Sequence, residues 1–148
     1  MSCRTHRAWF AMFLVSLFVW AGSAHAMDIS GTIATTLTIL ENSKLVGDVT
    51  CTVSGAACIV LGGSGVTLDL NGFSITGLGD SRTGCAGSQT GTEIGIDVNA
   101  LTNVVIRGPG VVQQFRSFGI RLLNSTGVTV TGVTASTNCF SGIFLNGG

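Results

Sequence analysis

The sequence predicts an all-β fold, a solenoid of parallel strands in which each sequence repeat forms one coil. Residues 95–98, 119–122 and 142–145 share the pattern Gly-Ile-x-Val/Leu and so recur with a period of about 24 residues. A second pattern, at residues 104–108 and 128–132, recurs with the same period. A fixed period in this range is typical of solenoids, whose stacked repeats bury a shared core.

Alternation of apolar and polar residues indicates strands. Residues 66–72 (VTLDLNG) alternate with period two and end at an Asn-Gly turn signal. Leu68 and Leu70 should face the core, and Thr67 and Asp69 should face solvent. Because strands one repeat apart run in the same direction, we expect them to stack in parallel. Helical periodicity is not visible after residue 26.

We expect one domain at residues 27–148, built from about five coils of roughly 24 residues. The first coil is irregular and covers about residues 29–57. Val66 and Val104 are separated by roughly one and a half repeats, and the surplus is predicted to form a Gly- and Ser-rich loop insertion at about residues 78–93. The last coil begins at Gly142 and stops. The chain is therefore predicted to be truncated at its C-terminal end, with further coils or a capping partner after Gly148.

Residues 1–26 have the pattern of a signal peptide. Arg4 and Arg7 precede an apolar run at residues 11–21, and Ala24-His25-Ala26 is a small-residue cleavage site. The run is shorter than the roughly 20 residues that span a bilayer, although an uncleaved anchor stays open as the alternative. We expect a secreted, periplasmic or cell-surface protein with no membrane span in the mature chain.

The composition after residue 26 excludes several classes of partner. Five Lys and Arg face seven Asp and Glu, and no basic patch is visible, so nucleic acid is not an expected partner. No histidine follows the signal peptide and the cysteine spacing is not that of a zinc site. We therefore predict no metal and no cofactor.

Four cysteines, Cys51, Cys58, Cys85 and Cys139, follow residue 26. An even number in an exported chain indicates disulfides, for which three connectivities are possible. The repeat places all four near turns along one edge of the solenoid. We predict the pairs Cys51–Cys58 and Cys85–Cys139, the second of which would attach the insertion to the later coils.

Residues 65–72, 103–110 and 127–132 (GVTLDLNG, NVVIRGPG and GVTVTG) resemble right-handed parallel β-helix proteins of the pectin-lyase-like superfamily. More narrowly, they look like exported bacterial right-handed β-helix region proteins. The resemblance covers about residues 29–148. It implies an exported protein whose long strand-lined face can lie along a carbohydrate chain. The superfamily includes pectate lyases, polygalacturonases, alginate epimerases and proteins without catalysis, so the fold alone assigns no reaction.

Asp97, Arg121 and Phe144 occupy the middle of the three Gly-Ile-x-Val/Leu strands, and Val60 precedes them. Their side chains should point outward on successive coils, about 4.8 Å apart. An acid, a base and an apolar platform in line can contact a sugar, so these three are the candidate binding residues. The alternative is a cross-strand ion pair worth under about 1 kcal/mol.

A second outward column joins Asp69, Arg107 and Thr131, which occupy the same position after Val66, Val104 and Val128 in three successive coils. Opposite charges on neighbouring coils favour one register, and we interpret this column as a register device. No motif of a pectate lyase or polygalacturonase maps onto the sequence, so no catalytic residue is predicted.

These features predict an exported β-helix domain that binds an acidic polysaccharide or a cell-surface glycan, or processes it. One alternative is a non-catalytic structural or surface-adhesion solenoid. Another is the N-terminal part of a polysaccharide lyase, hydrolase or epimerase.

Overall fold

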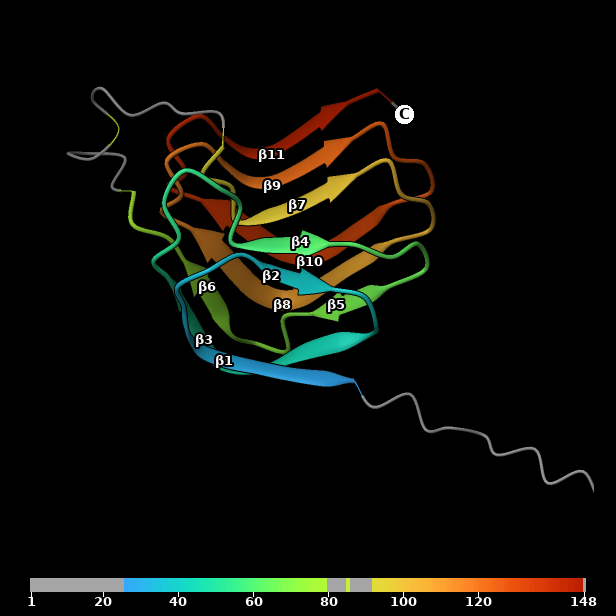
Figure 1. Cartoon of the computed structure of the whole chain (residues 1–148), viewed down its shortest axis with the longest axis horizontal. Coiled ribbons are helices and arrows are strands. Elements are labelled where there is room, and N and C mark those ends of the chain that lie inside the picture. Colours follow the sequence, from blue (N-terminus) through green and yellow to red (C-terminus); the bar gives the residue numbers. More distant parts are fainter. Residues whose placement is uncertain (1–25, 80–84, 86–91, 148) are drawn as a thin grey trace, which may run out of the picture.

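A computed structural model describes residues 26–79, 85 and 92–147, and this part of the chain contains strands and no helix (Figure 1). Apart from Ala26, the predicted signal peptide lies outside the described residues, as do most of the predicted insertion and Gly148. The strands are β1 (Met27–Ile33), β2 (Leu37–Ile39), β3 (Ser43–Cys51), β4 (Ile59–Leu61), β5 (Thr67–Asp69), β6 (Ser74–Thr76), β7 (Ile96–Asn99), β8 (Val105–Gln113), β9 (Phe118–Leu123), β10 (Thr129–Ser136) and β11 (Ser141–Asn146).

The strands form two parallel sheets, which confirms the all-β class and the parallel stacking. The six-stranded sheet has the order β1-β3-β5-β8-β10, with β6 paired to both β3 and β8. The five-stranded sheet has the order β2-β4-β7-β9-β11. The chain passes from one sheet to the other and back, so strands that are successive in one sheet are separated in sequence by strands of the other (Figure 1). We call one pass through both sheets a layer.

The sequence repeat sets the register of the later strands. Ile96 of β7 pairs with Ile120 of β9, and Ile120 pairs with Ile143 of β11. In the other sheet, Val105 of β8 pairs with Thr129 of β10. Each of these offsets is the single repeat that the two sequence patterns predict.

The first layer is shorter than the repeat. Ile29 of β1 pairs with Leu45 of β3, only about two thirds of a repeat later, and Leu37 of β2 pairs with Ile59 of β4 after slightly less than one repeat. Short connections at residues 34–36 and 40–42 join β1 to β2 and β2 to β3. Residues 29–57 are expected to form one irregular coil. They instead contain most of β1 and all of β2 and β3, and these strands belong to two layers.

The core lies between the sheets and is built from columns of inward side chains. Ile59, Ile96 and Ile120, which are paired across β4, β7 and β9, are each 0% exposed. Full burial of such a side chain contributes about 1.5–3 kcal/mol. Because the same position is apolar in each repeat, each layer extends one continuous core.

Two glycines allow neighbouring strands to approach where the six-stranded sheet bends. The register of β10 against β8 shifts between Thr131 and Val133, next to Gly132, whose φ is +65°. A Cβ placed on Gly108 of β8 would overlap the carbonyl oxygen of Gly132. Glycine is required at Gly108 by this close approach and is favoured at Gly132 by the left-handed backbone.

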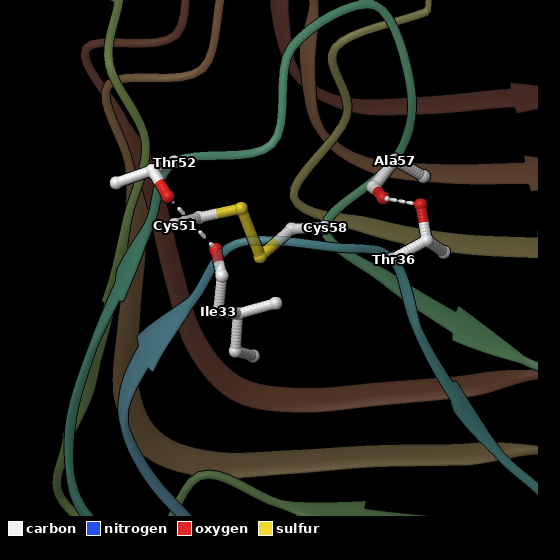
Figure 2. Close-up of a disulfide and its surroundings, with 6 residues drawn as sticks. All are labelled: Ile33, Thr36, Cys51, Thr52, Ala57 and Cys58. Atoms are coloured by element: carbon white, nitrogen blue, oxygen red, sulfur yellow. Dashed lines mark hydrogen bonds between the residues drawn. A yellow bond between two sulfur atoms is a disulfide. The ribbon is translucent and has the colours of Figure 1, made fainter.

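The structure contains a disulfide between Cys51 and Cys58, one of the two pairs that the sequence analysis predicts. It links the end of β3 to the start of β4 and so closes the corner between the two sheets (Figure 2). Both cysteines are buried. Figure 2 also shows the hydroxyl of Thr36 donating to the carbonyl of Ala57 (2.8 Å), which adds a cross-layer contact at the same corner.

The second predicted pair, Cys85–Cys139, is also present. Cys139 lies in the connection from β10 to β11, and its backbone N–H donates to the carbonyl of Phe115 in the connection from β8 to β9 (2.9 Å). Gly79, at the start of the predicted insertion, donates in the same way to Gln114 (2.6 Å). Both disulfides thus lie at the connections from the six-stranded to the five-stranded sheet.

Candidate functional site

The structure brings the predicted column together on the five-stranded sheet. Val60, Asp97, Arg121 and Phe144 are successive register partners on β4, β7, β9 and β11. Arg121 donates from Nε to Asp97 Oδ1 (2.8 Å) and from Nη2 to Oδ2 (2.7 Å). This two-pronged geometry is the strongest form of an Arg–carboxylate contact.

The Asp97–Arg121 pair is more enclosed than an outward position suggests. Asp97 is 9% exposed, and the Arg121 side chain is 23% exposed. The hydrogen bonds to Asp97 raise the pKa of the Arg121 guanidinium, while its partial burial acts in the opposite direction. The two groups neutralise each other, which is the arrangement of a structural ion pair.

Phe144 lies in an aromatic cluster that the sequence analysis did not identify. Its ring stacks on Phe118 with centroids 4.5 Å apart, and Phe140 meets Phe118 edge to face at 5.1 Å. Phe118 is buried and Phe140 is 61% exposed. The sequence could have indicated Phe118, because it directly precedes the Gly119 repeat. Phe140 lies in a connection and has no counterpart in the repeat.

The second column is longer than the three residues that the sequence indicates. Asp28, Lys44, Asp69, Arg107 and Thr131 are successive register partners from β1 to β10. Arg107 Nε donates to Asp69 Oδ2 at 2.8 Å, and Lys44 Nζ lies 3.7 Å from Asp28 Oδ1. Charges therefore alternate in sign along the outer face of the six-stranded sheet. We refer to these five residues as the charged column.

A depression of about 220 Å³ opens on the charged column. Its lining includes Lys44, Asp69 and Arg107, together with the polar side chains of Asn42 and Thr67. Asn42 Oδ1 accepts from the Thr67 backbone N–H at 2.8 Å, which holds the amide against the rim. The Lys44 and Arg107 side chains are 49% and 55% exposed, so both cations are accessible to a ligand.

The sequence analysis does not identify a further ion pair, Glu93–Arg116, because it places Glu93 in the predicted insertion. Glu93 is 7% exposed, and its Oε1 accepts from Arg116 Nη1 (3.3 Å), from the Gly55 N–H (3.0 Å) and from the Ser54 hydroxyl (3.2 Å). The two partners are one repeat apart, and this spacing was the available signal. The ion pair joins the base of the insertion to the connection between β8 and β9, and the bonds from Ser54 and Gly55 join it to the connection between β3 and β4.

Within residues 26–79, 85 and 92–147, no group of three or more His, Cys, Asp or Glu side chains could hold a metal ion. The same residues contain no helix long and apolar enough to cross a membrane.

No protein-family model, curated protein or solved structure gives a significant match to this chain.

Proposed function

We propose that this protein is an exported right-handed parallel β-helix of the pectin-lyase-like type that binds acidic polysaccharide. The observation that carries the binding proposal is the depression on the charged column, where two accessible cations flank a carboxylate. The fold proposal is supported by the alternation of the chain between two parallel sheets and by the sequence resemblance. Export is supported by the signal-peptide pattern and by the two disulfides, because disulfides persist in oxidising compartments.

The chemistry of the depression suits a carboxylate-bearing sugar polymer. Lys44 and Arg107 are two layers apart, roughly 9.6 Å at the usual strand spacing. A polyuronate lying across the strands can bring a carboxylate to each cation. Asp69, Asn42 and Thr67 between and beside them can accept from or donate to sugar hydroxyls.

The ion pair between Lys44 and Asp28 does not prevent this binding. Lys44 and Asp28 are both about half exposed and are 3.7 Å apart. An exposed pair of this kind is worth at most about 1 kcal/mol. Lys44 can therefore exchange its contact with Asp28 for one with a ligand carboxylate at little energetic cost.

The predicted column on the other sheet stays a second candidate surface for the same ligand. Arg121 is engaged by Asp97 in a two-pronged pair, so the charged column offers the more accessible cations. Phe140 and Phe144 offer apolar ring surface to a sugar but carry no charge that selects an acidic polymer. Binding at the charged column should weaken when Arg107 is replaced, whereas binding on the five-stranded sheet should weaken when Arg121 is replaced.

We expect the protein to bind sodium polygalacturonate or alginate, and not a neutral glucan, in isothermal titration calorimetry. Arg107→Gln and Lys44→Gln should each weaken binding about 10-fold, the size of one charge-assisted hydrogen bond. Binding should also weaken as salt is raised, because the contacts are exposed.

Arg121→Gln is the matched control, because it removes the same charge from the other sheet. It should leave the affinity within about two-fold while lowering stability. If Arg121→Gln abolishes binding and Arg107→Gln does not, the surface of the five-stranded sheet is the binding site. Release of unsaturated or reducing ends during the titration would identify processing as well as binding.

A structural solenoid is the second candidate function, and one observation favours it. Each Lys and Arg among the described residues has a carboxylate partner within 4.0 Å, as expected of charges that serve to fix register (Lys44, Arg107, Arg116 and Arg121). The absence of binding to every acidic polymer tested would support this role and contradict the proposal.

A further inference from the structure

The predicted signal-peptide cleavage site lies beside the depression on the charged column. Cleavage after Ala26 makes Met27, the first residue of β1, the first residue of the mature chain. Ala26 is exposed and is itself one of the residues that line the depression. Cleavage therefore removes one part of the lining and leaves a free α-amino group next to it.

Met27 is fixed in the fold by contacts that do not involve the residues before it. Its backbone N–H donates to the carbonyl of Asn42 at 3.1 Å, and its register partner on β3 is Ser43. Its side chain packs against the hydrophobic core. A chain end that pairs within a sheet is held in place. After cleavage the nitrogen can keep its bond to Asn42, and its other two N–H groups can donate to a ligand.

The charged column has no net charge before this cleavage. Its two cations are Lys44 and Arg107, and its two carboxylates are Asp28 and Asp69. An α-amino group is mainly protonated at neutral pH. The amino group of Met27 therefore gives the column a net positive charge. Such a surface attracts an acidic polymer over a distance, whereas a neutral one does not.

The amino group also lies within reach of a ligand in the depression. Its hydrogen-bond partner Asn42 and the nearby Lys44 both belong to the lining. Ser43, the register partner of Met27, directly precedes Lys44 on β3. Neighbouring strands are about 4.8 Å apart. A carboxylate that contacts Lys44 from the depression can therefore accept from the amino group as well.

We infer that cleavage after Ala26 completes the binding site, because the α-ammonium group of Met27 joins Lys44 and Arg107 as a third cation. The step is hydrolysis of the Ala26–Met27 peptide bond by a signal peptidase. Water supplies the hydroxyl of the new Ala26 carboxyl group and a proton of the new amino group. The uncleaved chain binds acidic polysaccharide weakly and the exported chain binds it more tightly. This inference rests on the proposed function and on the predicted cleavage.

The test is isothermal titration calorimetry with a short oligogalacturonate on two forms purified from an oxidising compartment. The first is the exported wild type, whose intact mass should show that it begins at Met27. The second has Gly-Ser inserted between Ala26 and Met27, which moves the ammonium group by up to about 7 Å without changing the net charge. Met27 keeps its amide bond to Asn42, so β1 should fold as before. The inserted form should bind about 10-fold more weakly, the size of one charge-assisted contact.

Asp28→Asn in the inserted form is the rescue. It removes one carboxylate and so restores the net positive charge of the column. Binding should recover most of the loss that the insertion causes. A failure of this rescue would show that the insertion acts through the structure of β1, and would overturn the inference.

The remaining outcomes separate this inference from the proposed function. If the two forms bind equally well while Lys44→Gln still weakens binding, the inference is overturned and the proposed function stands. An exported wild type that does not begin at Met27 also overturns the inference alone. A wild type that binds no acidic polymer contradicts both. So does binding that neither the insertion, nor Lys44→Gln, nor Arg107→Gln weakens, because such binding lies elsewhere on the molecule.

Discussion

Replacing Cys85 and Cys139 together by alanine should lower the free energy of unfolding by about 4 kcal/mol, according to the chain-entropy model. The two cysteines are far apart in sequence, with a separation of 54, so their disulfide removes a large loop-closure entropy from the unfolded chain. In the folded chain the bond attaches a residue of the insertion to the connection between β10 and β11. Equilibrium denaturation in guanidinium chloride, under oxidising conditions, measures the loss.

Thr134→Ala is a suitable control for the cysteine variant, because Thr134 is exposed on β10 in the same layer. This substitution should change the free energy of unfolding by less than about 0.5 kcal/mol. A loss below about 1 kcal/mol in the double cysteine variant would mean that the disulfide adds little to a chain already held by its layers.

Ile120→Ala should lower the free energy of unfolding by about 2–5 kcal/mol, the range for truncating a buried isoleucine. Ile120 is 0% exposed and lies between Ile96 and Ile143 in the central column of the five-stranded sheet. Its truncation would leave a cavity in the middle of that column. Thermal and chemical unfolding both measure this effect.

Ile143→Ala offers a matched comparison, since it makes the same truncation in the same column one layer further along. Ile143 is 45% exposed, so its loss should be about half that of Ile120. Equal losses at the two positions would show that Ile143 is as buried in solution as Ile120, contrary to its exposed fraction.

The register of the later layers was predictable because one motif recurs there. Each Gly-Ile-x-Val/Leu stretch places an apolar residue, an outward residue and a second apolar residue in the same order, so aligning the motifs aligns the strands. Asp97 and Arg121 could be paired in this way from the sequence, and the structure pairs them. The disulfide pairs followed from the same alignment, because it placed the turns along one edge.

The first layers could not be predicted in this way. β1 and β3 pair with an offset clearly shorter than the repeat, and no shared motif marks that offset. The extension of the charged column to Asp28 and Lys44 depends on it and was therefore missed. The depression that supports the binding proposal includes Lys44, so the sequence alone favoured the other sheet as the candidate surface.

The sequence also does not indicate how deeply an outward-facing side chain is buried. Alternation tells which side of a strand a residue occupies, but it does not tell how far neighbouring side chains cover that side. Asp97 is outward and yet 9% exposed. Glu93 lies at the end of the predicted loop insertion and yet is 7% exposed beside Arg116. Both carboxylates are held by an arginine one repeat later.

The most direct test of the proposed polysaccharide binding is a heteronuclear NMR titration of the protein with a short oligogalacturonate. We predict that amide shifts change at Asn42, Lys44, Thr67, Asp69 and Arg107, which line the depression on the charged column. Shifts confined to β9 and β11, the strands that carry Arg121 and Phe144, would contradict the assignment of this surface. The absence of any shift at the highest oligogalacturonate concentration would contradict it as well.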